Sequence, residues 1–282
     1  METETHRLLN LNLFCLQHKS VLLKLLDEHG DPILDSKKRP RCATGFLTKE
    51  EGAAYLYTAW HVVTGAGDPY NIKKPNPPRV DKILIYSQDV VSETSAITRI
   101  GKKAENILEL YLNNGEQKKP LWKQDEQNTP DDYWNEIGIQ IPIWHDLIKI
   151  KVDLPEVMIN TLAFNQDGFV SNFMLNIGEK VLISGFPYGY SSMGLTQPTP
   201  IILTRYIAAI HVEGRRKSFL IDGACFPVMS GSPVFVIRDN KLLLCGVYTG
   251  IKYPDYNENE NLENDRNAGL GICDDINEYV MI

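Results

Sequence analysis

The sequence has little that would mark a nucleic-acid-binding, membrane-spanning or metal-binding protein. Its 29 Lys and Arg residues are outnumbered by 36 Asp and Glu residues, which gives a net charge of -7. A general nucleic-acid-binding protein normally carries a basic face instead. No stretch approaches the roughly 20 apolar residues of a membrane-spanning helix. The five cysteines show no metal-ligand spacing. We therefore expect no nucleic-acid partner, no membrane association, no metal and no cofactor.

The cysteines and the first residues of the chain bear on cellular location. The number of cysteines is odd, and we expect each to be a buried free thiol: Cys15, Cys42, Cys225, Cys245 and Cys273. Structural disulfides are typical of secreted proteins, so free thiols favour a reducing compartment. The segment Met1–Arg7 is acidic where a secretory signal would be basic. The sequence predicts a cytoplasmic protein in which Leu8–Leu16 is part of an N-terminal arm.

Strand signals dominate a chain of 282 residues with 43% hydrophobic residues, which is enough for a sizeable core. Ala43–Leu47 and Ala53–Tyr57 flank the turn-rich Thr48–Gly52 and predict a β-hairpin. Many short strands separated by turns indicate barrels or a sandwich. Further expected strands are Val21–Leu26, Ile83–Tyr86, Ala96–Ile100, Ile107–Leu112, Ile137–Ile141, Ile201–Tyr206, Ser218–Ile221 and Leu242–Tyr248.

The chain divides into three expected parts. Residues 1–17 form the N-terminal arm, 18–150 the first barrel and 151–282 the second barrel. A linker is expected from about Pro142 to Phe169, and a short closing helix over Asp274–Val280.

Two distant segments carry residues suited to nucleophilic catalysis. Phe226–Val236 places Ser230 on a tight turn of small residues before an apolar strand, and Tyr57–Val63 places His61 at the end of a buried strand. A serine nucleophile needs an adjacent base, and these segments supply one of each. Ser232 is read as a turn hydroxyl. Cys225 lies five residues before Ser230 and off the turn, which argues against a cysteine nucleophile.

Four motifs resemble those of the chymotrypsin-fold serine peptidases, especially intracellular bacterial trypsin-like peptidases and the protease domain of HtrA-type enzymes. The family's Thr-Ala-x-His motif stands here as Thr58–His61, and its nucleophile motif as Val228–Pro233. Gly178–Pro187 is similar to its second-barrel signature, and Gly246–Gly250 to the strand beside its specificity pocket. The resemblance implies an all-β fold of two packed six-stranded antiparallel β-barrels, with a catalytic triad in the cleft between them and peptide-bond hydrolysis as the reaction.

The resemblance also implies the roles of individual residues. Ser230 attacks the scissile carbonyl, and His61 is the general base. The family's acid precedes an aliphatic run, which here is Ile137–Ile139, so Glu136 is the expected third member. Asp131 and Asp132, on the preceding loop, are the alternatives.

The oxyanion hole departs from the family pattern. The resemblance implies that the backbone N–H groups of Val228 and Ser230 form this hole. The family usually has glycine at the first of these positions, because the backbone takes φ > 0 there. A β-branched residue with φ > 0 is a steric outlier. We therefore expect a zymogen-like resting enzyme in which a partner or a substrate flips this loop into place.

The resemblance further implies a specificity pocket made by Ala224, Tyr248, Thr249, Gly250 and Gly269. A pocket lined by neutral residues favours small or apolar substrate side chains. Asp222 and the acidic loop after Tyr253 keep a preference for basic residues open as the alternative.

Two functions from different classes follow from these features. The first is a cytosolic serine endopeptidase that acts on proteins or peptides, with an activating protein partner as an option. The second is a catalytically degraded protease fold that binds a peptide or protein without cutting it. Ser230 and His61 favour the enzyme, whereas Glu136 and Val228 favour the binding module.

Overall fold

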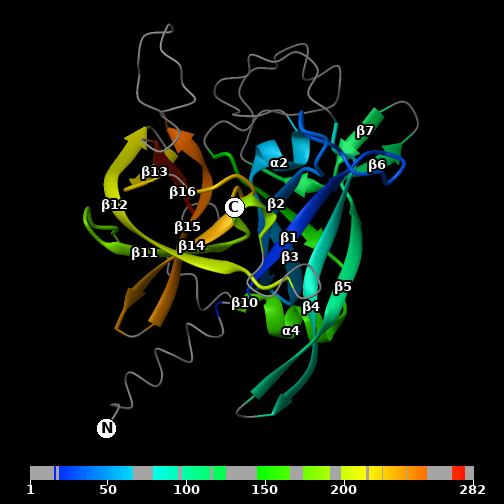
Figure 1. The fold of residues 1–282 in the computed structure, drawn as a ribbon, viewed down its shortest axis with the longest axis horizontal. Helices are drawn as coiled ribbons and strands as arrows, with labels where there is room; N and C mark the ends of the chain where they lie inside the picture. Colours follow the sequence, from blue (N-terminus) through cyan, green and yellow to red (C-terminus); the bar gives the residue numbers. More distant parts are fainter. Residues whose placement is uncertain are drawn as a thin grey trace, which may run out of the picture.

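The computed structural model describes residues 16, 19–65, 79–94, 97–114, 117–124, 145–165, 174–190, 198–213, 216–223, 225–239, 241–252 and 269–276. Over these residues the chain forms a half-barrel sheet in its first half and a closed barrel in its second half (Figure 1). The predicted all-β fold class is confirmed.

The first half is an eight-stranded sheet. Seven strands follow the order β5-β4-β1-β2-β3-β9-β8, and β10 pairs in parallel with β2. The strands are β1 (Ser20–Leu26), β2 (Cys42–Glu50), β3 (Ala53–Thr58), β4 (Lys82–Thr94), β5 (Ile97–Glu109), β8 (Trp122–Lys123), β9 (Ile148–Val152) and β10 (Phe164–Asn165). A separate hairpin pairs β6 (Tyr111–Asn114) with β7 (Gln117–Pro120). The predicted β2–β3 hairpin is present, with Phe46 opposite Tyr57.

The second half is a closed six-stranded barrel in the order β11-β12-β13-β16-β15-β14. Its strands are β11 (Lys180–Gly185), β12 (Ile201–Glu213), β13 (Arg216–Ile221), β14 (Ser232–Arg238), β15 (Lys241–Lys252) and β16 (Leu270–Asp275). A short 3₁₀ turn, η2 (Pro187–Gly189), follows β11. Closure leaves no free sheet edge in the barrel, so its connecting loops are supported by paired strands on both sides.

Two expectations about local structure were wrong. The segment expected as a linker contains strand β9, which pairs with β3, and helix α4 (Glu156–Leu162). The alternation Ile148, Ile150, Val152 is the pattern of a strand with one buried face. Asp274 and Asp275, expected in a closing helix, end strand β16 instead. The expected strand Ile137–Ile141 lies outside the described residues.

Buried apolar side chains form one cluster in each half and a third between them. The third cluster draws Phe46 and Tyr57 from the first sheet and Leu182, Phe235 and Val247 from the barrel. Leu16 of the expected N-terminal arm is 1% exposed and belongs to this cluster. The two halves are therefore joined by an apolar interface as well as by the polar contacts described below.

Three further observations concern the described part of the chain. No helix there is long and apolar enough to cross a membrane. No group of His, Cys, Asp and Glu side chains within it could hold a metal ion. Its four described cysteines, Cys42, Cys225, Cys245 and Cys273, are free thiols.

Candidate active site

His61 lies in a short helix that directly follows the β2–β3 hairpin. Helix α2 spans Trp60–Thr64 and ends at Gly65, whose φ of 72° is the left-handed conformation typical of a helix C-terminus. Trp60, Val62 and Val63 are buried, so the helix is anchored by its apolar side chains. The side chain of His61 is 20% exposed and can reach a substrate.

The carboxylate of Asp146 holds the imidazole of His61. The distance from His61 Nδ1 to Asp146 Oδ2 is 2.6 Å, and the backbone N–H of His61 donates to Asp146 Oδ1 at 2.9 Å. The carbonyl of Asp146 also accepts the N–H of Trp60 at 3.2 Å. Because Nδ1 faces a carboxylate, it carries the proton, which leaves Nε2 as the basic nitrogen.

Asp274 of the second barrel fixes the backbone of Asp146. One of its carboxylate oxygens accepts the N–H of Asp146 at 2.8 Å. The side chain of Asp146 is 7% exposed, and residue Asp274 is fully buried on strand β16. The acid beside His61 is therefore positioned by a contact between the two halves.

The structure assigns the carboxylate beside His61 differently from the sequence-based expectation. Glu136, Asp131 and Asp132 lie outside the described residues, and Nδ1 of His61 faces Asp146 instead. A sequence signal for Asp146 does exist, since it precedes the aliphatic strand Ile148–Val152, just as Glu136 precedes Ile137–Ile139. Two acid-plus-strand patterns compete in this region, and the contact between His61 Nδ1 and Asp146 Oδ2 favours the second of them along the chain.

Ser230 follows a tight turn formed by Phe226–Met229. The N–H of Met229 donates to the carbonyl of Phe226 at 3.2 Å, Pro227 is the second residue, and Val228 has φ of 77°. Proline at the second position and φ > 0 at the third are the features of a type II β-turn. Val228 therefore already has the φ > 0 that the family's glycine takes, which is strained for a β-branched residue, and the turn is not the unflipped one expected at rest.

Tyr188, a second residue with a strained backbone, forms a hydrogen bond with this turn. Within the described ranges, five non-glycine residues have φ > 0: Lys38, Glu51, Tyr188, Val228 and Asp239. Tyr188, with φ of 54°, donates its N–H to the carbonyl of Pro227 at 2.7 Å. The C=O and N–H of a trans peptide point in opposite directions, so the N–H of Val228 points away from Tyr188. Backbone strain of this kind persists only where the surroundings enforce it.

Two N–H groups of the serine turn find no acceptor in the described part of the chain. The N–H of Met229 donates to the carbonyl of Phe226, and the N–H of Gly231 donates to that of Tyr248. The N–H of Ser232 donates to the carbonyl of Met229. Among the residues that the structure describes, the N–H groups of Val228 and Ser230 have no acceptor. These are the two groups that the resemblance assigns to the oxyanion hole, and they are available to donate hydrogen bonds to a developing oxyanion.

Thr44 of strand β2 anchors the carbonyls of the same turn. Its hydroxyl donates to the carbonyl of Val228 at 2.8 Å, and its N–H donates to the carbonyl of Ser230 at 3.0 Å. Its hydroxyl also accepts the N–H of Phe186 at 3.3 Å. Thr44 is fully buried. Sequence reasoning missed this residue because nothing in a single strand marks a threonine that contacts the other half.

Gly231 brings the serine turn against the histidine segment. A Cβ atom added to Gly231 would overlap the carbonyl oxygen of Thr44 and the hydroxyl of Thr58, the first residue of the Thr58–His61 motif. Gly231 also has φ of 87°, which glycine adopts without strain. The structure therefore packs the turn that carries Ser230 directly against the segment that carries His61.

The other predicted residues lie at several places near the serine turn. Ser232 is fully buried at the start of β14, which suits a turn hydroxyl, whereas Ser230 is partly exposed. Tyr248, Thr249 and Gly250 follow one another on β15, and a Cβ at Gly250 would meet nothing within 4 Å. Open space therefore adjoins this strand. Gly269 is buried, and Ala224 lies outside the described residues.

The thiol of Cys225 is unsuited to nucleophilic attack. Burial raises its pKa to about 12, and the nearby Arg205 opposes this rise only partly. A thiol with this pKa remains protonated near neutrality, and the thiolate is the nucleophilic form. This agrees with the expectation that cysteine chemistry is not used here.

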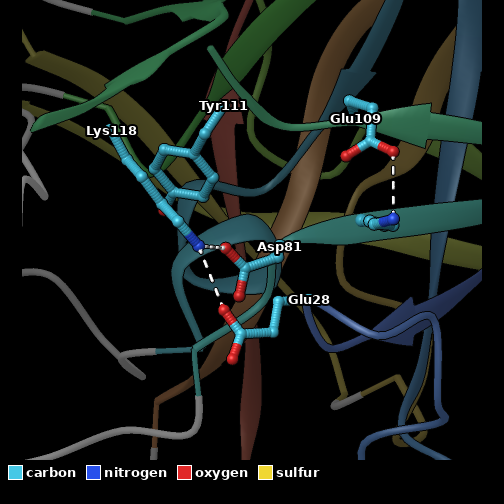
Figure 2. A pocket seen from close by; sticks show the side chains of 6 residues that line it. Glu28, Asp81, Glu109, Tyr111 and Lys118 are labelled. Carbon is cyan, nitrogen blue, oxygen red and sulfur yellow. Dashed lines mark hydrogen bonds and ion pairs between the residues drawn. The ribbon is translucent and has the colours of Figure 1, made fainter. Parts of the chain in front are cut away.

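A polar cavity of about 240 Å³ lies in the first half, lined by Glu28, Asp81, Lys82, Glu109, Tyr111 and Lys118. Figure 2 shows Lys118 directed at Asp81 and Glu28, with Nζ–oxygen distances of 2.6 and 3.6 Å. Lys82 pairs with Glu109 at 3.1 Å. Its charged groups therefore largely satisfy one another, and none of the predicted site residues lines it.

Comparison with known proteins adds little to these observations. No protein-family model matches the chain, and no curated protein matches its sequence. A thermostable serine protease from an extremophilic microorganism is a structural neighbour, with a TM-score of 0.43 and 9% sequence identity over 92% of this chain and 91% of that chain. The roles of the site residues rest on the geometry described above.

Proposed function

We propose that this chain is a serine endopeptidase whose triad consists of Ser230, His61 and Asp146. The observation that carries the proposal is the 2.6 Å contact between His61 Nδ1 and Asp146 Oδ2, on a segment packed against the serine turn. Acyl transfer requires a carboxylate, an imidazole, a serine hydroxyl and backbone N–H donors for the oxyanion. Asp146, His61 and Ser230 supply the first three, and the N–H groups of Val228 and Ser230 are the donors.

In the proposed reaction, Ser230 Oγ attacks the carbonyl carbon of the scissile bond and His61 Nε2 takes its proton. The carbonyl oxygen becomes an oxyanion that accepts hydrogen bonds from the N–H groups of Val228 and Ser230. His61 then gives the proton to the leaving amine. Asp146 keeps the imidazole oriented and stabilises its positive charge. Water repeats these steps on the acyl-enzyme.

We further propose that the resting enzyme is only conditionally active. Ser230 Oγ forms no hydrogen bond with a described residue, so its bond to His61 forms when substrate is bound. The strain at Val228 makes a relaxed turn a close competitor in free energy. Binding of a substrate or a protein partner would favour the strained turn because only that turn presents its N–H to the oxyanion.

A catalytically degraded protease fold that binds a peptide or protein is the second candidate. The observation in its favour is again the strained Val228, since a turn that relaxes would lose one oxyanion donor while leaving a binding surface. The cytoplasmic location remains a proposal based on the odd number of cysteines. Fractionation of cells producing the full protein would test it.

Labelling with a fluorophosphonate probe tests the enzyme proposal. The wild-type protein is compared with Ser230→Ala, His61→Ala and Ser232→Ala. We expect labelling of the wild type and of Ser232→Ala, and loss of labelling in the other two. Failure of the wild type to label, alone and with a broad peptide mixture added, would leave the binding module as the better description. Labelling that persists in Ser230→Ala would exclude Ser230 as the nucleophile.

A further inference from the structure

Three exposed aromatic side chains form a cluster beside the serine turn. Tyr188 is 56% exposed, Tyr190 67% and Phe226 39%. The rings of Tyr188 and Phe226 have centroids 5.2 Å apart, and those of Tyr188 and Tyr190 are 6.3 Å apart. Contiguous exposed apolar surface commonly marks a binding site, and aromatic residues dominate such sites. We call Tyr188, Tyr190 and Phe226 the aromatic cluster.

The aromatic cluster is attached to the peptide that carries one oxyanion donor. Phe226 is the first residue of the turn that contains Val228, and the ends of such a turn lie within about 7 Å of each other. Tyr188 donates its backbone N–H to Pro227, whose carbonyl belongs to the same peptide as the N–H of Val228. The N–H of Val228 points away from the backbone of Tyr188, so a substrate carbonyl bound there lies across this peptide from Tyr188. At about 3.3 Å per residue, the next one or two substrate residues can reach past the turn to the cluster.

The position of strand β15, which carries three of the residues expected in the specificity pocket, indicates which part of the substrate meets the cluster. Tyr248, Thr249 and Gly250 lie on β15, which holds the C-terminal side of the serine turn through the bond from the N–H of Gly231 to the carbonyl of Tyr248. The cluster lies on the N-terminal side of the same turn. Under the proposed function, the acyl part of the substrate lies beside Tyr248, Thr249 and Gly250, so its leaving part extends toward the cluster on the other side of the turn.

We propose that the aromatic cluster binds the leaving-group side of the substrate and selects peptides with an aromatic or large aliphatic residue at the first or second position after the scissile bond. This inference rests on the proposed endopeptidase function. It assigns a substrate class to that site, because burying one large apolar side chain against these rings favours such peptides over polar ones by about tenfold or more.

Cleavage of a proteome-derived peptide mixture, read by mass spectrometry, tests the inference with the full chain. We expect the wild type to cut about tenfold more often before aromatic and large aliphatic residues than before polar ones. In Tyr190→Ser and in Tyr190→Ser/Phe226→Ser, this preference should fall stepwise toward unity, while the preference on the acyl side of the bond stays as in the wild type. Tyr206→Ser removes a similarly exposed tyrosine outside the cluster and should change neither preference.

Three results would overturn the inference. A wild type without apolar preference after the scissile bond, or a preference that survives both substitutions, would show that the cluster does not select substrate. An equal change on both sides of the bond would show that the substitutions act through the serine turn. If fluorophosphonate labels the wild type in these cases, the proposed function stands and only the inference fails. A wild type that neither labels nor cleaves would overturn both.

Discussion

Replacing Val228 with glycine should stabilise the serine turn and speed reaction of Ser230 with a fluorophosphonate. Val228 has φ of 77° at the third position of its turn, and only glycine adopts this conformation without steric cost. The proline before it and the hydrogen bond from Tyr188 hold this geometry, so the substitution should leave the turn in place. What changes is the free energy of the strained turn relative to a relaxed one.

The expected size of the effect follows from two opposing contributions. The left-handed conformation costs a non-glycine residue about 1–2 kcal/mol. Glycine loses about 0.5–1 kcal/mol more conformational entropy on folding. The net gain is about 0.5–1 kcal/mol, and at about 2–4 °C per kcal/mol this raises Tm by about 1–4 °C. If the relaxed turn is the main resting state, removal of 1–2 kcal/mol of strain speeds labelling by about fivefold or more.

The assay compares Tm and the labelling rate of Val228→Gly with those of the wild type and of Lys38→Gly. Lys38 also has positive φ, at 59°, and lies in an exposed turn, so its substitution should raise Tm without changing labelling. A lower Tm in Val228→Gly would refute the strain argument. A higher Tm with an unchanged labelling rate would refute the proposed resting state, because the active turn would then already be populated.

Three further predictions follow from contacts around the site and in the barrel. Thr44→Val removes the hydroxyl that bonds the carbonyl of Val228 and the N–H of Phe186. We expect denaturant titration to show a loss of about 1–3 kcal/mol in unfolding free energy, and labelling by fluorophosphonate to be slower. Thr44→Ser keeps the hydroxyl and should behave like the wild type. Asp146→Asn should reduce the peptide cleavage rate by about 10⁴-fold. Asp274→Leu, which removes the acceptor for the N–H of Asp146, should reduce the rate by less. Asp274→Asn should be faster than Asp274→Leu because its amide oxygen can still accept that N–H. The hydrogen bonds from Arg238 lower the pKa of Glu179 below its usual 4.5. The ionised Glu179 therefore stabilises the fold above pH 4.5, and this contribution is lost as the pH falls through the lowered pKa. Tm measured against pH should fall less steeply in acid for Glu179→Gln than for the wild type.

Local patterns in the sequence predicted much of the fold. The arms of the β2–β3 hairpin carry β-branched and aromatic residues and flank a Glu51–Gly52 turn, so the information needed lies within seventeen residues, from Cys42 to Thr58. His61 and Ser230 could be proposed as site residues because their motifs are also local. Strand β9 was missed because the segment around it was read as a linker, although Ile148–Val152 alternates as a strand should.

The parts of the site that were missed depend on contacts between distant segments. Asp146 could not be chosen over Glu136 from the chain alone, since both precede an aliphatic run. Asp274 acts on a residue 128 positions away, and Thr44 on one 184 positions away. Neither has a sequence pattern of its own, because its role is defined by how the two halves pack. The steric cost of a β-branched residue at position 228 could be predicted from the residue type, whereas the φ > 0 that Val228 takes in the turn could not.

The contacts of Thr44 and Asp274 mean that neither half of the molecule contains a complete site. His61 and Asp146 belong to the first half, whereas Ser230 and Asp274 belong to the second. Under the proposed function, a chain in which only one half has folded has no complete triad, although its unfolded segments are then potential substrates. Docking of the halves would complete the triad only after these segments are packed away. The division of the site would thus protect each molecule from cleaving itself during folding.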